Sequence, residues 1–440
     1  MDNNYKKLLL YSHNITPRLK YITAFIGQQL QGKEIEITTD KNYFKQQQGV
    51  KINYSNERAS DEEFRVQNTE LLFETGVIEQ NVKCFEAADY KAFFETGGDF
   101  PFDVFAASFY LLSRYEEYLP HKKDLYGRYA YENSLAFKNN FLDQPLINTW
   151  LEDFKKALKA QFLGYQPVHS RFRFIPTYDI DEAYSYKHKQ GWRTAGGFIK
   201  SVFNGHWSSL IERMAVLNGK KKDPFDSYAW MDRLNQQYKP EPYYFFLVAN
   251  KTGKYDKNIL PAKKAMQHLI QDHSSHYQIG VHPSWQSGDH SELLKLEILK
   301  LGHIAGKQIL SSRQHFIRLQ LPGTYRQLIN AGIESDFSMG YGSINGFRAS
   351  VASPFYWYDL QKEEQTRLQL YPFCFMDANS FFEQKLSPQQ ALEEMKQFYR
   401  VIKLVNGTMI TIWHNTFLGT GKLFEGWKEV YERFVREIFS

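Results

Sequence analysis

The second half of the chain alternates between short apolar runs and longer stretches in which apolar residues recur at helical spacing. The apolar runs predict strands at residues 172–178, 243–249, 277–281, 309–316, 334–339 and 408–414. The helical spacing predicts helices at residues 227–238, 262–271, 291–307, 324–332 and 387–405. Strands that alternate with helices indicate a parallel sheet with helices outside it, either a barrel or an open doubly wound sheet.

The N-terminal part of the chain has a different pattern. The predicted elements there are a strand at 7–12, a helix at 18–30, a strand at 69–75 and a helix at 102–119. No metal-ligand cluster or glycine-rich phosphate loop stands out in this part of the sequence. We therefore predict an α/β protein of two domains. A smaller α/β domain of unknown role occupies residues 1–165, and a (β/α) barrel-like domain, distorted and of about seven strands, occupies residues 166–440.

Two long segments interrupt the alternation, at residues 182–225 and 340–386. We expect them to form loops or extra elements over one face of the sheet. Asn406 and Gly407 follow the last predicted helix, as expected of residues that end a helix in the left-handed conformation. No G-x-G-x-x-G motif follows the first predicted strand of the second domain, so dinucleotide binding is disfavoured.

Composition narrows the class of protein. The 440 residues carry a net charge of +5 without a long Lys/Arg block, which gives nucleic-acid binding little support. The 2 cysteines exclude a disulfide framework and a cysteine-rich zinc site. No apolar stretch approaches the roughly 20 residues that span a bilayer, and the N-terminus lacks the pattern of a signal peptide. We therefore expect a cytoplasmic protein with no membrane span.

Residues that bind metal or move protons follow four of the predicted strands. They are Asp179 and Asp181 after the first strand, His282 after the third, Arg313 and His315 at the end of the fourth, and His414 at the end of the last. The carboxyl ends of parallel strands form the functional face of α/β folds. Two carboxylates beside a buried strand are costly unless they are paired, hydrogen-bonded or bound to metal. We therefore expect one site at this face.

Each of these residues also has a structural interpretation. His282 precedes Pro283 and would suit a turn in which its ring bonds to the backbone. His315 would suit a solvent contact, Arg313 a surface ion pair, and His414 a place in the core. All of these interpretations would have to hold at four strand ends together, which favours a shared site.

The residue types fit metal-assisted hydrolysis. A catalytic zinc takes about three protein ligands from His and Asp/Glu and keeps one position for water. Asp181, His282 and one more group would supply these ligands. The bound water has its pKa lowered toward roughly 7 and needs a base, for which Asp179 is the candidate. His414 would protonate the leaving group.

The order of these motifs resembles the polysaccharide deacetylase superfamily, carbohydrate esterase family 4. TYDID is similar to its first motif, which implies that Asp179 is the general base and Asp181 a metal ligand. VHPSWQ is similar to its H-x-x-x-H motif and implies that His282 is a second ligand. SRQHF resembles the family motif whose arginine borders the site, which carries that role to Arg313. TMITIWH resembles the family motif that ends in the catalytic histidine acid, which carries that role to His414.

The resemblance covers residues 170–440, and it departs from the family pattern at the metal. The stretch AGIESDFSMGYGSINGFRAS is also similar to bacterial members that have an extra N-terminal α/β domain. Ile180 separates the two aspartates, which are adjacent in the family motif. Gln286 stands where the family has its second metal-binding histidine, and glutamine is a poor zinc ligand. We expect His315 to replace it from the next strand end, with His290 in a polar loop as the less favoured substitute.

The resemblance implies a metal-dependent hydrolase that removes N-acetyl groups from an amino-sugar glycan or glycoconjugate. Its cofactor would be a divalent metal, expected to be zinc, held by Asp181, His282 and His315. Its partner would be a carbohydrate substrate with an N-acetylated amino sugar. No protein or nucleic-acid partner is implied.

The remaining candidate residues would support the site. Arg313 would hold and tune the base, and Asp336 would orient Arg313 or His414. Trp285 and Tyr178 are the candidate sugar-binding residues, and Trp285 suits a place at the rim or in the core equally well.

Two other functions stay open from the sequence. A carbohydrate-binding protein on a deacetylase scaffold would follow from loss of the metal, and chelators would not affect its glycan binding. A glycosidase would use Asp179 and a partner carboxylate about 5 to 9.5 Å away. It would need a second acid across the cleft, and His414 would be dispensable.

Overall fold

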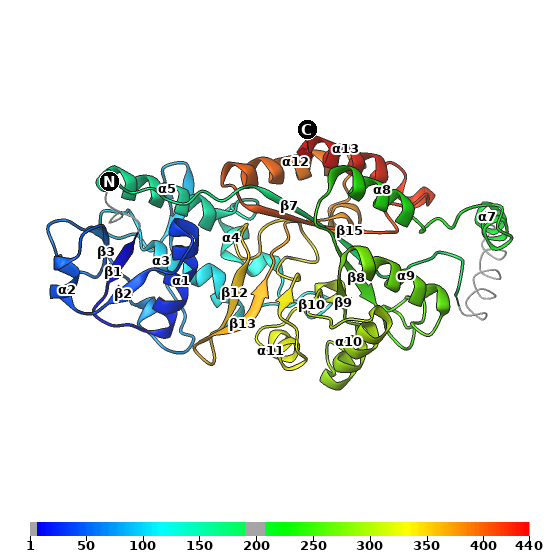
Figure 1. The fold of residues 1–440 in the computed structure, drawn as a ribbon, viewed down its shortest axis with the longest axis horizontal. Helices are drawn as coiled ribbons and strands as arrows, with labels where there is room; N and C mark the ends of the chain where they lie inside the picture. Colours follow the sequence, from blue (N-terminus) through cyan, green and yellow to red (C-terminus); the bar gives the residue numbers. More distant parts are fainter. Residues whose placement is uncertain (1–6, 190–206, 440) are drawn as a thin grey trace.

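The computed structural model describes residues 7–189 and 207–439 (Figure 1). Its N-terminal part contains a four-stranded parallel sheet in the order β2-β1-β3-β4. The strands are β1 (Leu8–Tyr11), β2 (Glu36–Thr38), β3 (Val50–Tyr54) and β4 (Phe64–Val66). The predicted strand at 7–12 and helix at 18–30 are confirmed by β1 and α1 (Pro17–Gln31).

Helix α1 begins and ends at signals that are present in the sequence. Thr16 accepts a hydrogen bond from the Leu19 amide, and Pro17 occupies the first helical position. Gly32 ends the helix in the left-handed conformation, with φ of 71°. The buried face of α1 packs against α3 (Val104–Leu112), so the two helices predicted in this part contact each other.

The rest of the N-terminal part consists of short elements and one long helix. They are α2 (Lys41–Gln46), η2 (Glu70–Leu72), β5 (Cys84–Ala87), β6 (Tyr90–Phe93), η3 (Tyr115–Tyr118), η4 (Tyr131–Asn133), α4 (Leu135–Lys138) and α5 (Leu146–Gln161). The predicted strand at 69–75 is wrong, because this stretch contains the helical turn η2. Asp103 accepts hydrogen bonds from the amide and hydroxyl of Thr69. The amide of Thr69 is therefore satisfied by a side chain, whereas in a strand it would bond to a neighbouring strand.

The predicted helix at 102–119 ends early. Arg114 adopts a left-handed conformation with φ of 55°, which separates α3 from η3. Its guanidinium forms buried ion pairs with Glu116 and Glu117, both 2.8 Å away. A buried arginine needs such partners, and the break in the helix allows both carboxylates to reach it.

The second part is built on a nine-stranded sheet, counted within the described residues, in the order β12-β13-β11-β10-β9-β8-β7-β15-β14. Its strands are β7 (Arg173–Ile180), β8 (Tyr243–Leu247), β9 (Gln278–His282), β10 (Ser311–Ser312), β11 (Ser335–Asp336), β12 (Phe355–Asp359), β13 (Glu364–Leu370), β14 (Phe375–Met376) and β15 (Thr408–His414). Every neighbouring pair is parallel except β12 and β13, which form an antiparallel hairpin. The carboxyl ends of the parallel strands therefore share one edge.

Helices cover the outside of this sheet, except for α7, which lies apart from it in Figure 1. The helices are α7 (Trp207–Leu217), α8 (Tyr228–Tyr238), α9 (Lys264–His276), α10 (Ser291–Ala305), α11 (Gly323–Asn330), α12 (Pro388–Leu404) and α13 (Trp427–Phe439), with short turns η5 (His315–Ile317), η6 (Asn379–Glu383) and η7 (Lys422–Phe424). Figure 1 shows α8, α12 and α13 grouped beside β7 and β15, with α9, α10 and α11 around the other strands. None of the helices in residues 7–189 and 207–439 has the length and apolar character needed to cross a lipid bilayer.

The predicted fold class is confirmed: the protein is mixed α/β, and its large parallel sheet curls like part of a barrel (Figure 1). The sheet has more strands than the expected seven because the segment at 340–386 supplies β12, β13 and β14. That segment is therefore partly an extension of the sheet rather than only a cover over one face.

The strand predicted at 309–316 shrinks to two residues in β10. After β10 the chain leaves the sheet and turns through Phe316 and Ile317, whose φ angles are 57° and 52°. A left-handed conformation at two bulky residues in succession is strained and persists only where surrounding structure fixes it. The strained turn immediately follows His315, one of the candidate site residues.

The N-terminal part packs against the segments that surround the large sheet. One apolar cluster runs from Leu8 in β1 to Val435 in α13. Glu117 and Arg348 form a buried ion pair at 2.6 Å that joins the two parts. Arg18 pairs with Glu363 at the turn between β12 and β13. The division into domains at residue 165 stays a prediction.

Candidate active site

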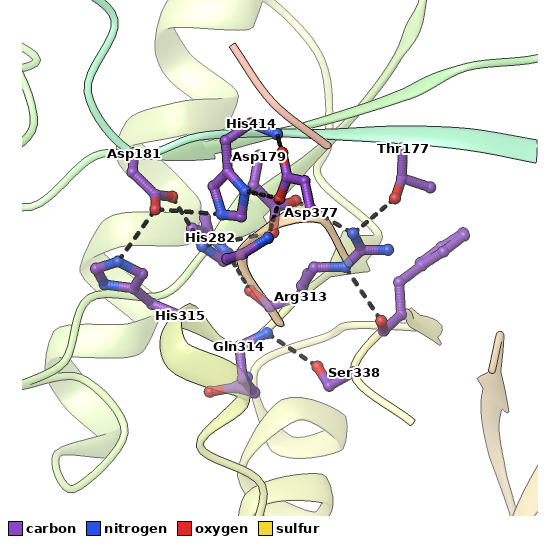
Figure 2. A network of polar contacts seen from close by, with 12 residues as sticks. Thr177, Asp179, Asp181, His282, Arg313, Gln314, His315, Ser338, Asp377 and His414 are labelled. Atoms are coloured by element: carbon purple, nitrogen blue, oxygen red, sulfur yellow. Dashed lines mark hydrogen bonds and ion pairs between the residues drawn. The ribbon is translucent and has the colours of Figure 1, made fainter. Parts of the chain in front are cut away.

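Strand β7 delivers the two aspartates to the edge of the sheet. Successive side chains of a strand point to opposite faces, so Thr177 and Asp179 share one face while Tyr178 points to the other. Asp181 follows the end of the strand. His414, the last residue of β15, pairs with Asp179 in the strand register. The sheet itself therefore sets these side chains next to one another (Figure 2).

Three histidine rings surround the carboxylate of Asp181 (Figure 2). Its Oδ1 lies 3.1 Å from Nε2 of His282. Its Oδ2 lies 3.5 Å from Nε2 of His315 and 3.6 Å from Nε2 of His414. One ligand atom each from Asp181, His282 and His315 lie within 4.8 Å of one another. The structure thus brings the three predicted metal ligands together, and their metal binding stays a prediction.

The rings of His282 and His315 are oriented by hydrogen bonds from Nδ1. His282 donates to the backbone carbonyl of Arg313 at 2.6 Å, and His315 donates to Oδ1 of Asp256 at 3.1 Å. Carbonyl and carboxylate oxygens accept hydrogen bonds, so Nδ1 carries the proton in both rings. Acceptors of this kind fix the tautomer and orientation of metal-binding histidines and leave Nε2 to the ligand.

His414 is held in the same way by Asp377, which follows β14. Nδ1 of His414 donates to Oδ1 of Asp377 at 2.6 Å, and the His414 amide donates to Oδ2 at 2.7 Å. Burial alone would lower the pKa of His414, but Asp377, together with the charges of Asp181 and Asp179, outweighs it and raises this pKa to about 10. Burial raises the pKa of Asp377, and His414 opposes that shift. At neutral pH the ring of His414 is therefore protonated.

Asp179 forms a buried pair with Arg313. Nη1 of Arg313 donates to Oδ1 of Asp179 at 3.2 Å and to the hydroxyl of Thr177 at 2.6 Å. Its Nε donates to the carbonyl of Phe337, and its guanidinium lies 4.7 Å from the ring centre of Phe245. Burial lowers the pKa of Arg313, and Asp179 opposes this. The pair gives each buried charge a counterion.

The donor set fits a divalent cation. When the ring of His282 is neutral, with its proton on Nδ1, its Nε2 presents a lone pair toward Oδ1 of Asp181, so a divalent cation would find two acceptor atoms at this point. That Oδ1 is buried and has no hydrogen-bond partner among the described residues. Burial would raise the pKa of Asp181, but the charges of His315 and His282 hold it well below its usual range. His315 in turn has its pKa raised to about 9, because Asp181 outweighs the effect of burial.

The structure places His315, and neither His290 nor Gln286, beside Asp181 and His282. His315 is buried in the cluster, whereas His290 is an exposed residue that precedes α10. Gln286, which stands at the usual histidine position, is also exposed. The loop that carries both residues therefore does not contribute to the cluster.

Neither of the two candidate sugar-binding residues lines the cleft described below. Tyr178 is not a sugar-binding residue: it is fully buried and shares a hydrogen bond with the hydroxyl of Tyr431 on the opposite face of the sheet. Trp285 stacks on Tyr255 with ring centres 3.9 Å apart. Tyr255 lines the cleft described below, and Trp285 supports it from behind without lining the cleft.

Asp336 forms no hydrogen bond to Arg313 or His414 among the described residues, but its charge opposes the lowering of the Arg313 pKa by burial. Its Oδ2 accepts hydrogen bonds from the hydroxyls of Ser312 and Ser338, and its Oδ1 accepts one from the Ser338 amide. Burial raises the pKa of Asp336 to about 6. These serine contacts brace the start of the turn after β10, while Thr177 and Asp377 provide the direct contacts expected of Asp336.

Sequence reasoning missed Asp256 and Asp377, the carboxylates that orient His315 and His414. Asp256 lies in a loop before α9, and Asp377 follows a strand of only two residues. Asp256 and His315 are 59 residues apart in the sequence, and Asp377 and His414 are 37 residues apart. These pairs form only through the fold, so their spacing in the sequence does not reveal them. The single sequence signal was the short apolar run before Asp377.

The cluster lies in a cleft of about 630 Å³. Aromatic side chains form much of its lining, namely Tyr126, Tyr255, Phe316, Phe382, Phe417 and Phe424. Tyr126 and Arg128 belong to the N-terminal part of the chain, which therefore contributes to the cleft. A polar cluster with aromatic walls is the usual composition of a site for a small organic ligand.

The comparisons with known proteins cover a family model and solved structures. A model described as a family of unknown function (DUF7033) matches residues 8–163. No curated protein matches the chain. Among solved structures, a Mycobacterium smegmatis protein assigned as a polysaccharide deacetylase is 12% identical, with a TM-score of 0.39 over 62% of this chain and 86% of that chain.

Two further solved structures are similar to the same extent. Puue allantoinase is 12% identical with a TM-score of 0.39, and the alignment covers 62% of this chain and 88% of that chain. A polysaccharide deacetylase from Bacillus cereus is 11% identical with a TM-score of 0.31, covering 61% of this chain and 89% of that chain. Similarities of this size concern the course of the chain and assign no activity.

Proposed function

We propose that the protein is a metal-dependent hydrolase that removes N-acetyl groups from an amino-sugar glycan or glycoconjugate. The observation that carries the proposal is the arrangement around Asp181. His282 and His315 each have Nδ1 fixed by an acceptor and turn Nε2 toward this carboxylate. The resemblance of the strand-end motifs to the polysaccharide deacetylase superfamily points to the same chemistry.

Asp181, His282 and His315 would hold the metal, for which zinc suits a donor set of two imidazoles and one carboxylate. A bound divalent metal supplies a Lewis acid that polarises a carbonyl oxygen and makes water more acidic. Asp256 keeps His315 in its metal-binding tautomer through the Nδ1 hydrogen bond.

Asp179 is the proposed base. It lies beside the ligand set, with Oδ2 3.8 Å from Nε2 of His282. Its other oxygen is held by Arg313, which orients the carboxylate and supplies its counterion. Asp179 accepts a proton from the water that attacks the acetamide carbonyl.

His414 is the proposed acid. Nε2 of His414 lies 3.6 Å from Asp181, at the edge of the ligand set, and Asp377 keeps the ring protonated. It donates this proton to the amine nitrogen as the carbon–nitrogen bond breaks, which leaves acetate and a free amino sugar. The aromatic walls of the cleft suit the apolar faces of sugar rings.

Elemental analysis of the purified protein tests the proposal, together with acetate release from oligosaccharides of N-acetylglucosamine. We expect about one zinc or other transition metal per chain, and loss of both metal and acetate release in His282→Ala and His315→Ala. His290→Ala is the matched control, because it removes an exposed histidine close in sequence to the site. A protein that takes up no metal even when zinc is supplied would exclude the hydrolase and favour a glycan-binding protein on this scaffold.

A further inference from the structure

The N-terminal part reaches the cleft through one tight turn at residues 123–129. Lys123 and Tyr129 form a bridge across its base, and the Asp124 amide donates to the carbonyl of Arg128 at 2.9 Å. Oδ1 of Asp124 also accepts the amides of Tyr126 and Arg128. The backbone around Tyr126 is therefore fixed within the turn itself.

Contacts across the cleft hold this turn against the second part of the chain. Nη1 of Arg128 donates to the carbonyl of Phe316 at 2.6 Å, and the Gln320 side chain donates to the carbonyl of Gly127 at 2.9 Å. The guanidinium of Arg128 occupies space that only a glycine leaves free, because a Cβ on Gly342 would lie 1.9 Å from its Nη1. The turn is thus docked at a defined position, next to the strained residue that follows His315.

The docked turn completes an aromatic wall. The ring of Tyr126 lies 5.3 Å from that of Phe316 and 6.4 Å from that of Tyr255, and all three residues line the cleft. Trp285 supports Tyr255 from behind, and Arg318 lies 4.1 Å from the Trp285 ring centre. Large aromatic surface left facing a cleft is costly in water unless a ligand covers it.

We propose that Tyr126, together with Tyr255 and Phe316, binds the sugar ring next to the one that carries the reacting acetamide. The inference rests on the proposed function and specifies its substrate as an oligosaccharide of at least two rings. Phe316 follows the metal-ligand candidate His315 directly, so the wall starts beside the reaction site and extends away from it to Tyr126. A cleft of about 630 Å³ has the size of sites that hold ligands larger than one sugar ring.

Calorimetric titration with N-acetylglucosamine and its β-1,4-linked trisaccharide tests this inference. All proteins carry Asp179→Asn, so that no substrate is consumed. We expect the parent to bind the trisaccharide more tightly than the monosaccharide, and Tyr126→Ala to raise the trisaccharide Kd about tenfold while leaving the monosaccharide Kd unchanged. Tyr126→Phe keeps the ring and should keep the affinity.

Leu125→Ala is the matched control, because Leu125 lies in the same turn with its side chain fully exposed. It should bind both saccharides as the parent does. Equal trisaccharide affinity in the parent and Tyr126→Ala would overturn the inference, and so would a parent that binds the trisaccharide no better than the monosaccharide.

The proposed function has separate readouts, namely metal content and acetate release. Trisaccharide binding that depends on Tyr126 in a chain without metal or acetate release would support the inference and overturn the hydrolase. Metal-dependent acetate release, with trisaccharide binding that does not depend on Tyr126, would support the hydrolase and overturn the inference. Circular dichroism of Tyr126→Ala, read against Tyr126→Phe, shows whether a loss of binding reflects unfolding.

Discussion

Asp377 holds His414 by its ring and by its backbone at the same time. Oδ1 accepts the Nδ1 proton at 2.6 Å, and Oδ2 accepts the amide proton at 2.7 Å. Because β14 pairs with β15, the residue that follows β14 is brought next to the residue that ends β15. The two contacts fix both the direction and the protonation of the imidazole.

Replacing Asp377 should therefore change the pH dependence of the reaction. Asp377 contributes most among the three carboxylates that raise the pKa of His414 to about 10, so Asp377→Asn should lower this pKa and leave less of the protonated acid above neutral pH. We expect kcat at pH 8 to fall by at least about tenfold and the alkaline limb of the kcat/KM profile to move to lower pH. Asp272→Asn, on an exposed face of α9, is the control. An unshifted alkaline limb would show that His414 is not the acid.

Asp256 should affect metal affinity rather than proton transfer. It accepts the Nδ1 proton of His315 and the amide of Trp285. Asp256→Asn retains an acceptor oxygen but loses the charge, and we expect about 10- to 100-fold weaker metal binding. Competition with a chromophoric chelator measures this directly. The same affinity in the variant and the parent would mean that His315 does not bind the metal.

Gly342→Ala should displace Arg128. The new Cβ would meet the guanidinium, whose hydrogen bond to the Phe316 carbonyl would break and leave that carbonyl without its partner. We expect a loss of about 1–3 kcal/mol in the free energy of unfolding, measured by urea titration. Gly323→Ala is the matched control, since a Cβ at Gly323 would meet no atom within 4 Å and the stability should not fall.

Glu117 should make stability depend on acid pH. Burial alone would raise the pKa of Glu117, but Arg348 and Arg114 lower it to about 2 from an ordinary value of 4.5. A carboxylate with a lowered pKa stabilises the fold above pH 4.5, and this contribution is lost as pH falls from 4.5 toward 2. Its size is about 3–4 kcal/mol at most, because each tenfold change in proton affinity corresponds to about 1.4 kcal/mol.

Urea titrations at pH 7 and pH 3 measure this contribution. Glu117→Gln should be less stable than the parent at pH 7, and the difference should shrink at pH 3. Glu57→Gln changes an exposed glutamate and should preserve the pH dependence of the parent. If the difference in the free energy of unfolding between Glu117→Gln and the parent is equally large at both pH values, the ionised carboxylate of Glu117 makes no contribution to stability.

The sequence predicted the parts of the site that depend on local pattern. Asp181, His282 and His414 each follow an apolar run that forms a strand, and parallel pairing brings such residues to one edge. The same reasoning, applied consistently, would have excluded Tyr178. A strand alternates its side chains, so a residue adjacent to Asp179 has to face away from it.

The remaining parts depend on contacts that leave no local trace. Asp256 reaches His315 across 59 residues, and Arg128 reaches Phe316 across 188. The strand predicted at 309–316 was shortened by a turn whose left-handed residues are bulky, so no glycine marked it. Tertiary packing therefore determines the conformation at these positions and overrides the strand preference of the local sequence.

The ion pair between Glu117 and Arg348 bears on how such a chain can change through evolution. Each residue is buried and each belongs to a different part of the molecule. A recombination event that exchanged either part alone would leave one charge in the interior without its counterion, which costs several kcal/mol. The two parts are therefore expected to be inherited together, with substitutions at one position compensated at the other.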